Sequence, residues 1–334
     1  MKNSRFFHLL RGKLQSVRSI LVRSTGTRSR TSLYPRQDLV FVKGLGIAMA
    51  ARLLGGILLG SIVAVPSMVA QQVPVQSPAE AQLNQGLQYV QQGRLQEAIG
   101  AFQQAVSIDP QFAPAYYNLG LALRQAGQLE AAADAFYRAT QTDPGFALAF
   151  GNLGAVLLEA NNLERATQYL ERSLELDPQL GFAHYNLGLV HFQQENLDDA
   201  IDSFRSAKRY SPNAPEPSYY LGIIYTERGR LRRARSELER AVELNENYAE
   251  AHYQLGSISL LEGDPDAALE SFRRSRDANP RYANAYYGAG LALIQQREFD
   301  LAREVLEYAR QLYLEQGQPQ WADNAARLLQ QISR

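Results

Sequence analysis

The sequence contains no cysteine and only four histidines among its 334 residues. Without cysteine the chain cannot form a disulfide, a thiolate metal site, an iron–sulfur cluster or a cysteine nucleophile. It also lacks a glycine-rich phosphate loop, a nucleophile elbow and a paired-carboxylate motif. We therefore predict that the protein is not an enzyme and that it holds no cofactor and no metal ion.

Acidic residues are nearly absent from the start of the chain. Residues 1–55 contain eleven Lys and Arg against one acid, Asp38, whereas residues 56–334 contain 23 bases against 33 acids. The formal net charge of zero is therefore the sum of a basic start and an acidic body. Because a body of net negative charge repels phosphates, we predict that it does not bind nucleic acid.

Long hydrophobic runs are also scarce, and the longest lies within residues 44–70, which carry one charge, Arg52. This segment predicts either an uncleaved transmembrane helix (a signal anchor) or a signal peptide cut after Ala70. Translation from Met49 would give a compact signal peptide. Residues 1–43 predict a basic disordered tail or, alternatively, an organellar transit peptide, and residues 71–78 predict an extended linker.

The positive charges before the hydrophobic segment predict its orientation. Segments rich in Lys and Arg stay in the cytoplasm, and no Lys or Arg occurs between Gly55 and Arg94. The body is therefore expected on the non-cytoplasmic side of a membrane, in a periplasm or a lumen, as part of a single-pass protein. If the signal is cleaved, the body is secreted.

Residues 79–316 consist of seven copies of a 34-residue repeat without insertion or deletion. The glycines in this register are Gly86, Gly120, Gly154, Gly188, Gly222, Gly256 and Gly290. The alanines in this register are Ala98, Ala132, Ala166, Ala200, Ala234, Ala268 and Ala302. Self-similarity at such a period is typical of a solenoid of stacked repeats.

Each repeat reads as a helical hairpin, because its apolar residues follow helical spacing in two successive segments. Glycine at the eighth position and alanine at the twentieth allow the two helices to approach closely, and a large residue such as Phe136 packs between them. A proline such as Pro144 ends the second helix. The loop residues expected in the left-handed conformation that caps a helix are Gly93, Gly127, Asn161, Gly229 and Gly263.

This pattern resembles the tetratricopeptide repeat family. The resemblance implies an all-α fold, a right-handed superhelical solenoid of seven helical hairpins. An array of this kind needs a polar cap, and residues 317–334 predict a C-terminal capping helix. Its apolar stripe consists of Trp321, Ala325, Leu328, Leu329 and Ile332.

In this family the first helix of each hairpin lines the concave surface, so its fifth and sixth positions are candidates for binding a partner. The sixth position holds Asn84, Asn118, Asn152, Asn186, Tyr220 and Gln254. The fifth position holds Tyr117, Tyr185, Tyr219, Tyr253 and Tyr287. The amides resemble the asparagine ladder of O-linked N-acetylglucosamine transferase, whose superhelix holds the backbone of an extended peptide.

An amide side chain both donates and accepts hydrogen bonds, so a row of amides can satisfy successive peptide groups. We therefore predict a peptide-binding groove. The alternative is that Tyr-Asn-Leu-Gly is the family consensus and that these residues serve the scaffold alone.

Three further features carry weaker predictions. Binding of heat-shock chaperone tails is not expected, because the family's carboxylate clamp needs Lys or Arg at positions two, five or six and none occurs there. His184 and His252 occupy a packed position and are read as buried neutral histidines. The arginines between Arg228 and Arg240 are read as a solvated face paired partly by Glu237 and Glu239, or else as a docking site for an acidic partner.

The sequence thus predicts a non-catalytic protein–protein interaction scaffold that binds extended segments of partner proteins, for assembly or transport at a membrane. One alternative is a regulatory or substrate-recruiting subunit of a separately encoded enzyme such as a glycosyltransferase. Another is a module that assembles with copies of itself.

Overall fold

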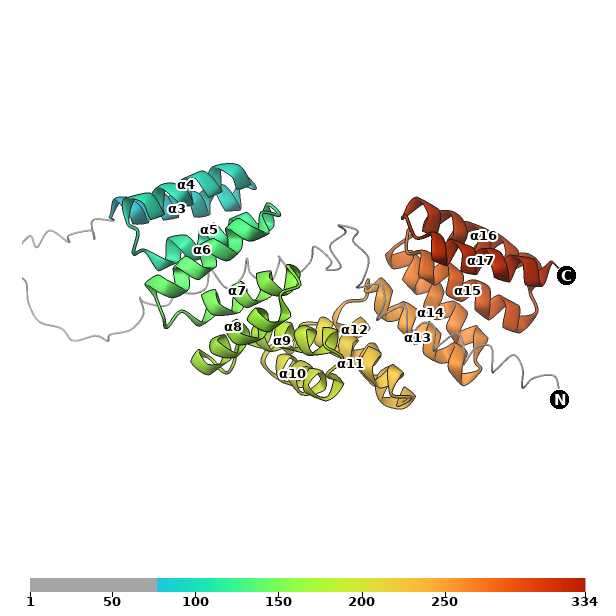
Figure 1. Ribbon diagram of the computed structural model, residues 1–334. Helices are drawn as coiled ribbons and strands as arrows, with labels where there is room; N and C mark the ends of the chain where they lie inside the picture. Colours follow the sequence, from blue (N-terminus) through green and yellow to red (C-terminus); the bar gives the residue numbers. More distant parts are fainter. Residues whose placement is uncertain (1–76, 334) are drawn as a thin grey trace, which may run out of the picture. The chain divides into compact units, whose positions relative to one another are not determined.

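The structure is a computed structural model that describes residues 77–333. The predicted tail, hydrophobic segment and all but the end of the linker lie outside the described residues. The described part of the chain is all-α (Figure 1). Its helices are α3 (Pro78–Gln91), α4 (Leu95–Ile108), α5 (Ala113–Gln125), α6 (Leu129–Thr142), α7 (Ala147–Glu159), α8 (Leu163–Leu176), α9 (Gly181–Gln193), α10 (Leu197–Tyr210), α11 (Glu216–Glu227), α12 (Leu231–Leu244), α13 (Ala249–Glu262), α14 (Pro265–Ala278), α15 (Ala283–Gln296), α16 (Phe299–Glu315) and α17 (Pro319–Ile332).

The chain divides into two compact units, one ending at Ala160 and the other beginning at Asn161. We call their described parts the N-terminal unit (77–160) and the C-terminal unit (161–333). In both, odd-numbered helices from α3 to α15 are the first helices of the hairpins and even-numbered helices from α4 to α16 are the second. The predicted fold class, an all-α array of helical hairpins with a capping helix, is confirmed.

The turn inside each hairpin uses a left-handed residue. All five residues predicted for this role have positive φ, from 59° at Asn161 to 85° at Gly263. Glu195 (φ 62°) and Arg297 (φ 68°) adopt the same conformation and were not predicted. They lie in the same 34-residue register, so the backbone geometry of the repeat is kept even where the residue is not glycine.

In most turns between hairpins an Asp or Asn directly follows the second helix, while Ser211 follows α10. The Asp109 carboxylate accepts a hydrogen bond from the Gln111 N–H at 2.9 Å, and the side chains of Asp143, Asp177, Asn245 and Asn279 bond the N–H two residues on in the same way. Asp and Asn favour such turns because the short side chain reaches its own backbone. The recurring Asp-Pro pair therefore ends one hairpin and starts the turn to the next.

Close approach of the two helices of a hairpin depends on the repeated glycine. A Cβ added at Gly256 would lie 2.7 Å from the buried Phe272 ring, and one at Gly222 would lie within 2.8 Å of the Leu238 side chain. Real Cβ atoms do not approach other atoms so closely, so the glycine is required by the packing. Phe272 would also lie 2.6 Å from a Cβ at Gly288 of the next hairpin, which places this ring between two glycines.

The C-terminal unit ends with α17 packed on α16. Leu312 and Tyr313 of α16 are buried, and the Trp321 ring stacks on Tyr313 with ring centroids 5.8 Å apart. The buried residues of α17 are Ala322, Ala325 and Leu328, while its outer face is polar. The helix therefore covers the last hairpin as a cap must.

Candidate functional site

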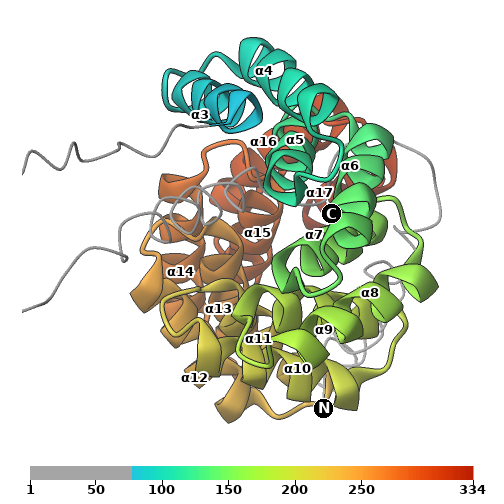
Figure 2. The same ribbon diagram turned by 90° about the vertical axis from the view of Figure 1, so that its left-hand side faces the viewer.

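The residues predicted to bind a partner all lie on first helices. Asn84 lies on α3, Tyr117 and Asn118 on α5, Asn152 on α7, Tyr185 and Asn186 on α9, Tyr219 and Tyr220 on α11, Tyr253 and Gln254 on α13, and Tyr287 on α15. Within the C-terminal unit, Figure 2 shows α9, α11, α13 and α15 on the inner side and α10, α12 and α14 on the outer side. We call the surface of the first helices the first-helix face.

The asparagines are oriented by their own helices. The side-chain N–H groups of Asn118, Asn152 and Asn186 donate to the backbone carbonyls four residues earlier, at 2.8 to 2.9 Å. This bond fixes the amide plane and uses one of its two N–H groups. Asn152 also donates to the Tyr117 hydroxyl at 3.4 Å and is only 3% exposed, so it offers less surface to a partner than Asn118 does.

The tyrosines of the fifth position pack their rings into the hairpins. The Tyr117 ring lies 4.9 Å from the Phe146 ring, Tyr219 lies 4.9 Å from Tyr248, and Tyr253 lies 5.7 Å from Phe272. One side of each of these half-buried rings therefore packs in the core, and only the exposed side is available for contact with a partner.

Burial of these tyrosines favours the neutral hydroxyl. It raises the pKa of Tyr117 from 10.0 to about 12, opposed by the hydrogen bond with Asn152 and by Arg124. It raises the pKa of Tyr287 to about 12, and the pKa of Tyr219 well above 10.0. The first-helix face therefore presents neutral phenol groups at physiological pH.

In several first helices the side chain at the fourth position forms a hydrogen bond with the turn that precedes the helix. The Nε2 atoms of His184 and His252 lie 2.9 and 2.8 Å from the carbonyls of Pro178 and Glu246, six residues earlier. Since a carbonyl only accepts, Nε2 carries the proton in both. The Tyr286 hydroxyl donates to the Pro280 carbonyl in the same way at 3.1 Å. Ser218 occupies this position in the fifth repeat, and its buried hydroxyl has no hydrogen-bond partner within residues 77–333.

Charge is distributed unevenly between the two sets of helices. The first helices carry one basic residue, Arg124, which pairs with Glu159. The bases of the second helices are Arg138, Arg165, Arg172, Arg205, Lys208, Arg209, Arg232, Arg233, Arg235, Arg240, Arg273, Arg274, Arg276, Arg303 and Arg310. The acids of the first helices are Glu80, Glu159, Glu216, Glu227, Glu250 and Glu262. The first-helix face is thus acidic and aromatic.

The arginine-rich second helix α12 is paired differently from the expectation. Glu237 does not pair with Arg233. Instead Lys208 donates to both Glu237 carboxylate oxygens, at 2.9 and 2.7 Å, while Arg235 pairs with Glu262 and Arg228 with Asp198. These partners lie on neighbouring hairpins, so tertiary packing decides the pairing.

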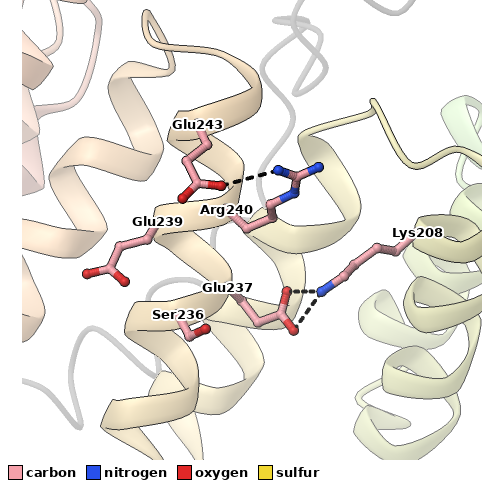
Figure 3. Close-up of a pocket in the computed structure, with 6 residues that line it drawn as sticks. All are labelled: Lys208, Ser236, Glu237, Glu239, Arg240 and Glu243. Atoms are coloured by element: carbon pink, nitrogen blue, oxygen red, sulfur yellow. Dashed lines mark hydrogen bonds and ion pairs between the residues drawn. The ribbon is translucent and has the colours of Figure 1, made fainter.

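A shallow cavity of about 320 Å³ lies between α10 and α12 beside these pairs. Figure 3 shows Lys208 reaching from α10 to Glu237 and Arg240 bonded to Glu243 within α12. Its two bases are therefore already paired with lining acids, and the cavity offers no unpaired cation to an anionic ligand. Among the described residues, no cluster of His, Asp and Glu could hold a metal ion.

None of the helices within residues 77–333 combines the length and the apolar character needed to span a bilayer. The predicted hydrophobic segment, residues 44–70, lies outside this range.

Two family profiles match the sequence. The profile of the C-terminal domain of cilia and flagella-associated protein 70, described as a TPR domain, matches residues 47–253, more than half of the chain. A tetratricopeptide repeat profile matches residues 262–313. A search of curated proteins gives no match.

Solved structures share the fold. The chain is 22% identical to PilF of Pseudomonas aeruginosa, with a TM-score of 0.56, and the alignment covers 62% of this chain and 94% of PilF. A tetratricopeptide repeat protein from Parabacteroides merdae is 17% identical, with a TM-score of 0.58 and coverage of 74% and 98%. YrrB, described as a TPR protein with an unusual peptide-binding site, is 32% identical with a TM-score of 0.48 and coverage of 58% and 99%.

Proposed function

The chain belongs to the tetratricopeptide repeat family, and we propose that it is a protein-interaction scaffold whose first-helix face binds extended segments of partner proteins. Proteins of this family generally bind protein or peptide partners and are generally not catalytic. The amides and tyrosines named above are the residues proposed to bind, and no chemistry is proposed.

The observation that carries the proposal is the orientation of the asparagines. Bonding to the helix carbonyl four residues back holds Asn118 and Asn186 in one rotamer each. A fixed amide loses little conformational entropy when it binds a peptide group, so its net contribution to affinity is larger than that of a mobile side chain. The amide oxygen and the second N–H then serve the partner's backbone, whatever its side chains.

The proposal is tested by selecting random twelve-residue peptides against the purified full-length chain and measuring the affinity of a selected peptide by fluorescence anisotropy. Replacing Asn118 and Asn186 together by Ala should weaken binding about five- to a hundredfold, since each lost hydrogen bond is worth about 0.5–1.5 kcal/mol. Replacing Gln104 and Gln141, exposed on second helices, should change affinity less than about twofold.

The opposite pattern would place binding elsewhere. If the glutamine pair weakens binding and the asparagine pair does not, while circular dichroism shows both variants folded, partners bind the second helices and the proposal is wrong.

We further propose that residues 1–70 place the array on the non-cytoplasmic side of a membrane, for assembly or transport there. The support is the charge bias of residues 1–55 and the apolar segment that follows Arg52. In membrane vesicles with the cytoplasmic face outward, added protease should leave the array intact until detergent is added. Digestion without detergent, or recovery of the whole chain in the soluble fraction, would contradict this proposal.

A further inference from the structure

Glu250 lies among tyrosines contributed by two neighbouring hairpins. It is the second residue of α13 and lies two residues after Tyr248, whose ring centroid is 4.9 Å from that of Tyr219 on α11. Tyr253 of α13 and Tyr282 of the next turn meet edge to face, with ring centroids 5.6 Å apart. Glu250 and Tyr253 are three residues apart and so lie on one face of α13. The pKa values of Tyr219 and Tyr282 are raised, mainly by burial and to a smaller extent by the negative charge of Glu250.

The Glu250 carboxylate has no basic partner within the described residues. It is half-buried, and no hydrogen bond or ion pair engages it. Glu262 on the same helix differs, since Arg235 from α12 pairs with it. The four first helices α9, α11, α13 and α15 contain no Lys and no Arg, so their own surface supplies no cation to Glu250.

A cation suits this environment for two reasons. Neutral tyrosine rings attract a cation to their faces, and the attraction grows as water is removed. Glu250 is an acidic residue in the first turn of α13, so it provides a carboxylate for the cation to meet. An anionic side chain would be repelled by Glu250, and the first helices of this unit carry no Lys or Arg to offset that repulsion.

We propose that the α11–α13 part of the first-helix face, centred on Glu250 and ringed by Tyr219, Tyr248, Tyr253 and Tyr282, receives a Lys or Arg side chain of the bound segment. The proposal rests on the proposed function and adds to it the chemical class of the partner, a basic extended peptide. Charge complementarity supports it, because Glu250 forms no ion pair within the described residues and the first helices of this unit carry no Lys or Arg.

The test uses three labelled twelve-residue peptides, alternating Ala with Lys, with Ser or with Glu, and the purified full-length chain at about 0.15 M salt, where exposed charges are largely screened. The lysine peptide should bind at least threefold more tightly than the serine peptide, and the glutamate peptide most weakly. E250Q should remove most of the lysine preference, a loss of about two- to fivefold, which is the range expected for a partly exposed ion pair.

A matched control separates this site from general attraction to an acidic protein. E304Q removes the same charge from the exposed Glu304 of α16 and should change lysine-peptide affinity less than twofold. E250K reverses the charge and should bind the glutamate peptide more tightly than the unsubstituted chain does. This gain of binding does not occur if the substitution merely unfolds the protein.

The outcomes distinguish the two proposals. Equal binding of all three peptides, unchanged by E250Q, would overturn the basic preference and leave peptide binding in place. An equal loss in E304Q and E250Q would also overturn it, because it would assign the preference to overall charge. If no peptide binds at 1 mM, roughly the weak limit of specific recognition, the scaffold proposal fails and this inference fails with it.

Discussion

First and second helices of the same hairpins have different surfaces although they share one core. The second helices carry most of the bases of the array, many of them in short-range pairs such as Arg172 with Glu175 at 2.9 Å and Arg273 with Glu270 at 2.8 Å. Such exposed pairs contribute little stability but keep the surface soluble. The first helices instead carry oriented amides, half-buried tyrosines and acids. Under the proposed function, the second helix of each hairpin keeps the surface soluble and the first helix binds the partner.

The largest expected effect on stability concerns the packing between first and second helices. Phe272 of α14 is fully buried between Gly256 of α13 and Gly288 of α15. Phe272→Ala should lower the free energy of unfolding by about 3–5 kcal/mol, because it leaves a cavity between first and second helices. Urea unfolding followed by circular dichroism measures it. Phe299→Ala, at a position 43% exposed, is the matched control and should cost less than about 1 kcal/mol. Equal costs would contradict this packing.

Replacing a glycine by alanine should have opposite effects on stability in a first helix and in a second helix. A Cβ at Gly290 of the first helix α15 would lie 2.6 Å from Leu306, so Gly290→Ala should destabilise by about 1–3 kcal/mol. Gly100 of the second helix α4 has nothing within 4 Å of an added Cβ, so Gly100→Ala should stabilise by about 0.5–1 kcal/mol. Thermal unfolding of the two variants measures both signs. If both variants are more stable, there is space for a Cβ atom at position 290, and the close packing against Leu306 is wrong.

Alkaline pH should act on the tyrosines of the first helices. Their pKa values are raised in the folded state, to about 12 for Tyr117 and Tyr287 against 10.0 for a free phenol. Above pH 10 the unfolded chain loses these protons first, so stability present below pH 10 falls as pH rises toward 12. Between pH 10 and 11 the loss should be about 1 kcal/mol per tyrosine. The double variant Tyr117→Phe, Tyr287→Phe should show a smaller loss, and an unchanged slope would refute the assignment.

The smallest effect concerns the turn that joins the two kinds of helix. Arg297 adopts a left-handed conformation at φ 68°, which suits glycine, so Arg297→Gly should stabilise the protein by about 1 kcal/mol. Gly263→Ala, at φ 85° in the preceding repeat, should destabilise by a similar amount. Urea midpoints of the two variants measure the contrast. If both substitutions shift the midpoint in one direction, backbone strain is not the cause.

The fold could be predicted from the sequence because its determinants recur in one register. Glycine and alanine at fixed spacing mark where the two helices of a hairpin approach closely, and proline marks the turn. The same three signals recur in successive hairpins, which supports the prediction. The left-handed conformation of Glu195 and Arg297 was not predicted, because only glycine and asparagine were expected to adopt it. Their positions in the 34-residue register indicate this conformation more strongly than the residue type does.

The candidate site was predicted less completely, since its details depend on contacts between hairpins. The spacing of Lys208 and Glu237 gives no hint of their pairing, because they meet only when α10 and α12 stack. Tyr282 lies at the end of the sixth repeat, so no reading of position five or six includes it, yet its ring packs on Tyr253. The bond from Asn118 to Pro114 spans one helical turn and was within reach of sequence reasoning.

The central claim, that partners bind the first helices, is tested most directly by site-specific photo-crosslinking in the native cell. Benzoylphenylalanine is placed at Gln254 on α13 and, in a second variant, at the exposed Ser236 on α12, and crosslinked peptides are identified by mass spectrometry. The account predicts a discrete partner segment, rich in Lys or Arg, crosslinked at position 254 and absent at position 236. A segment crosslinked at position 236 and absent at position 254 would contradict it.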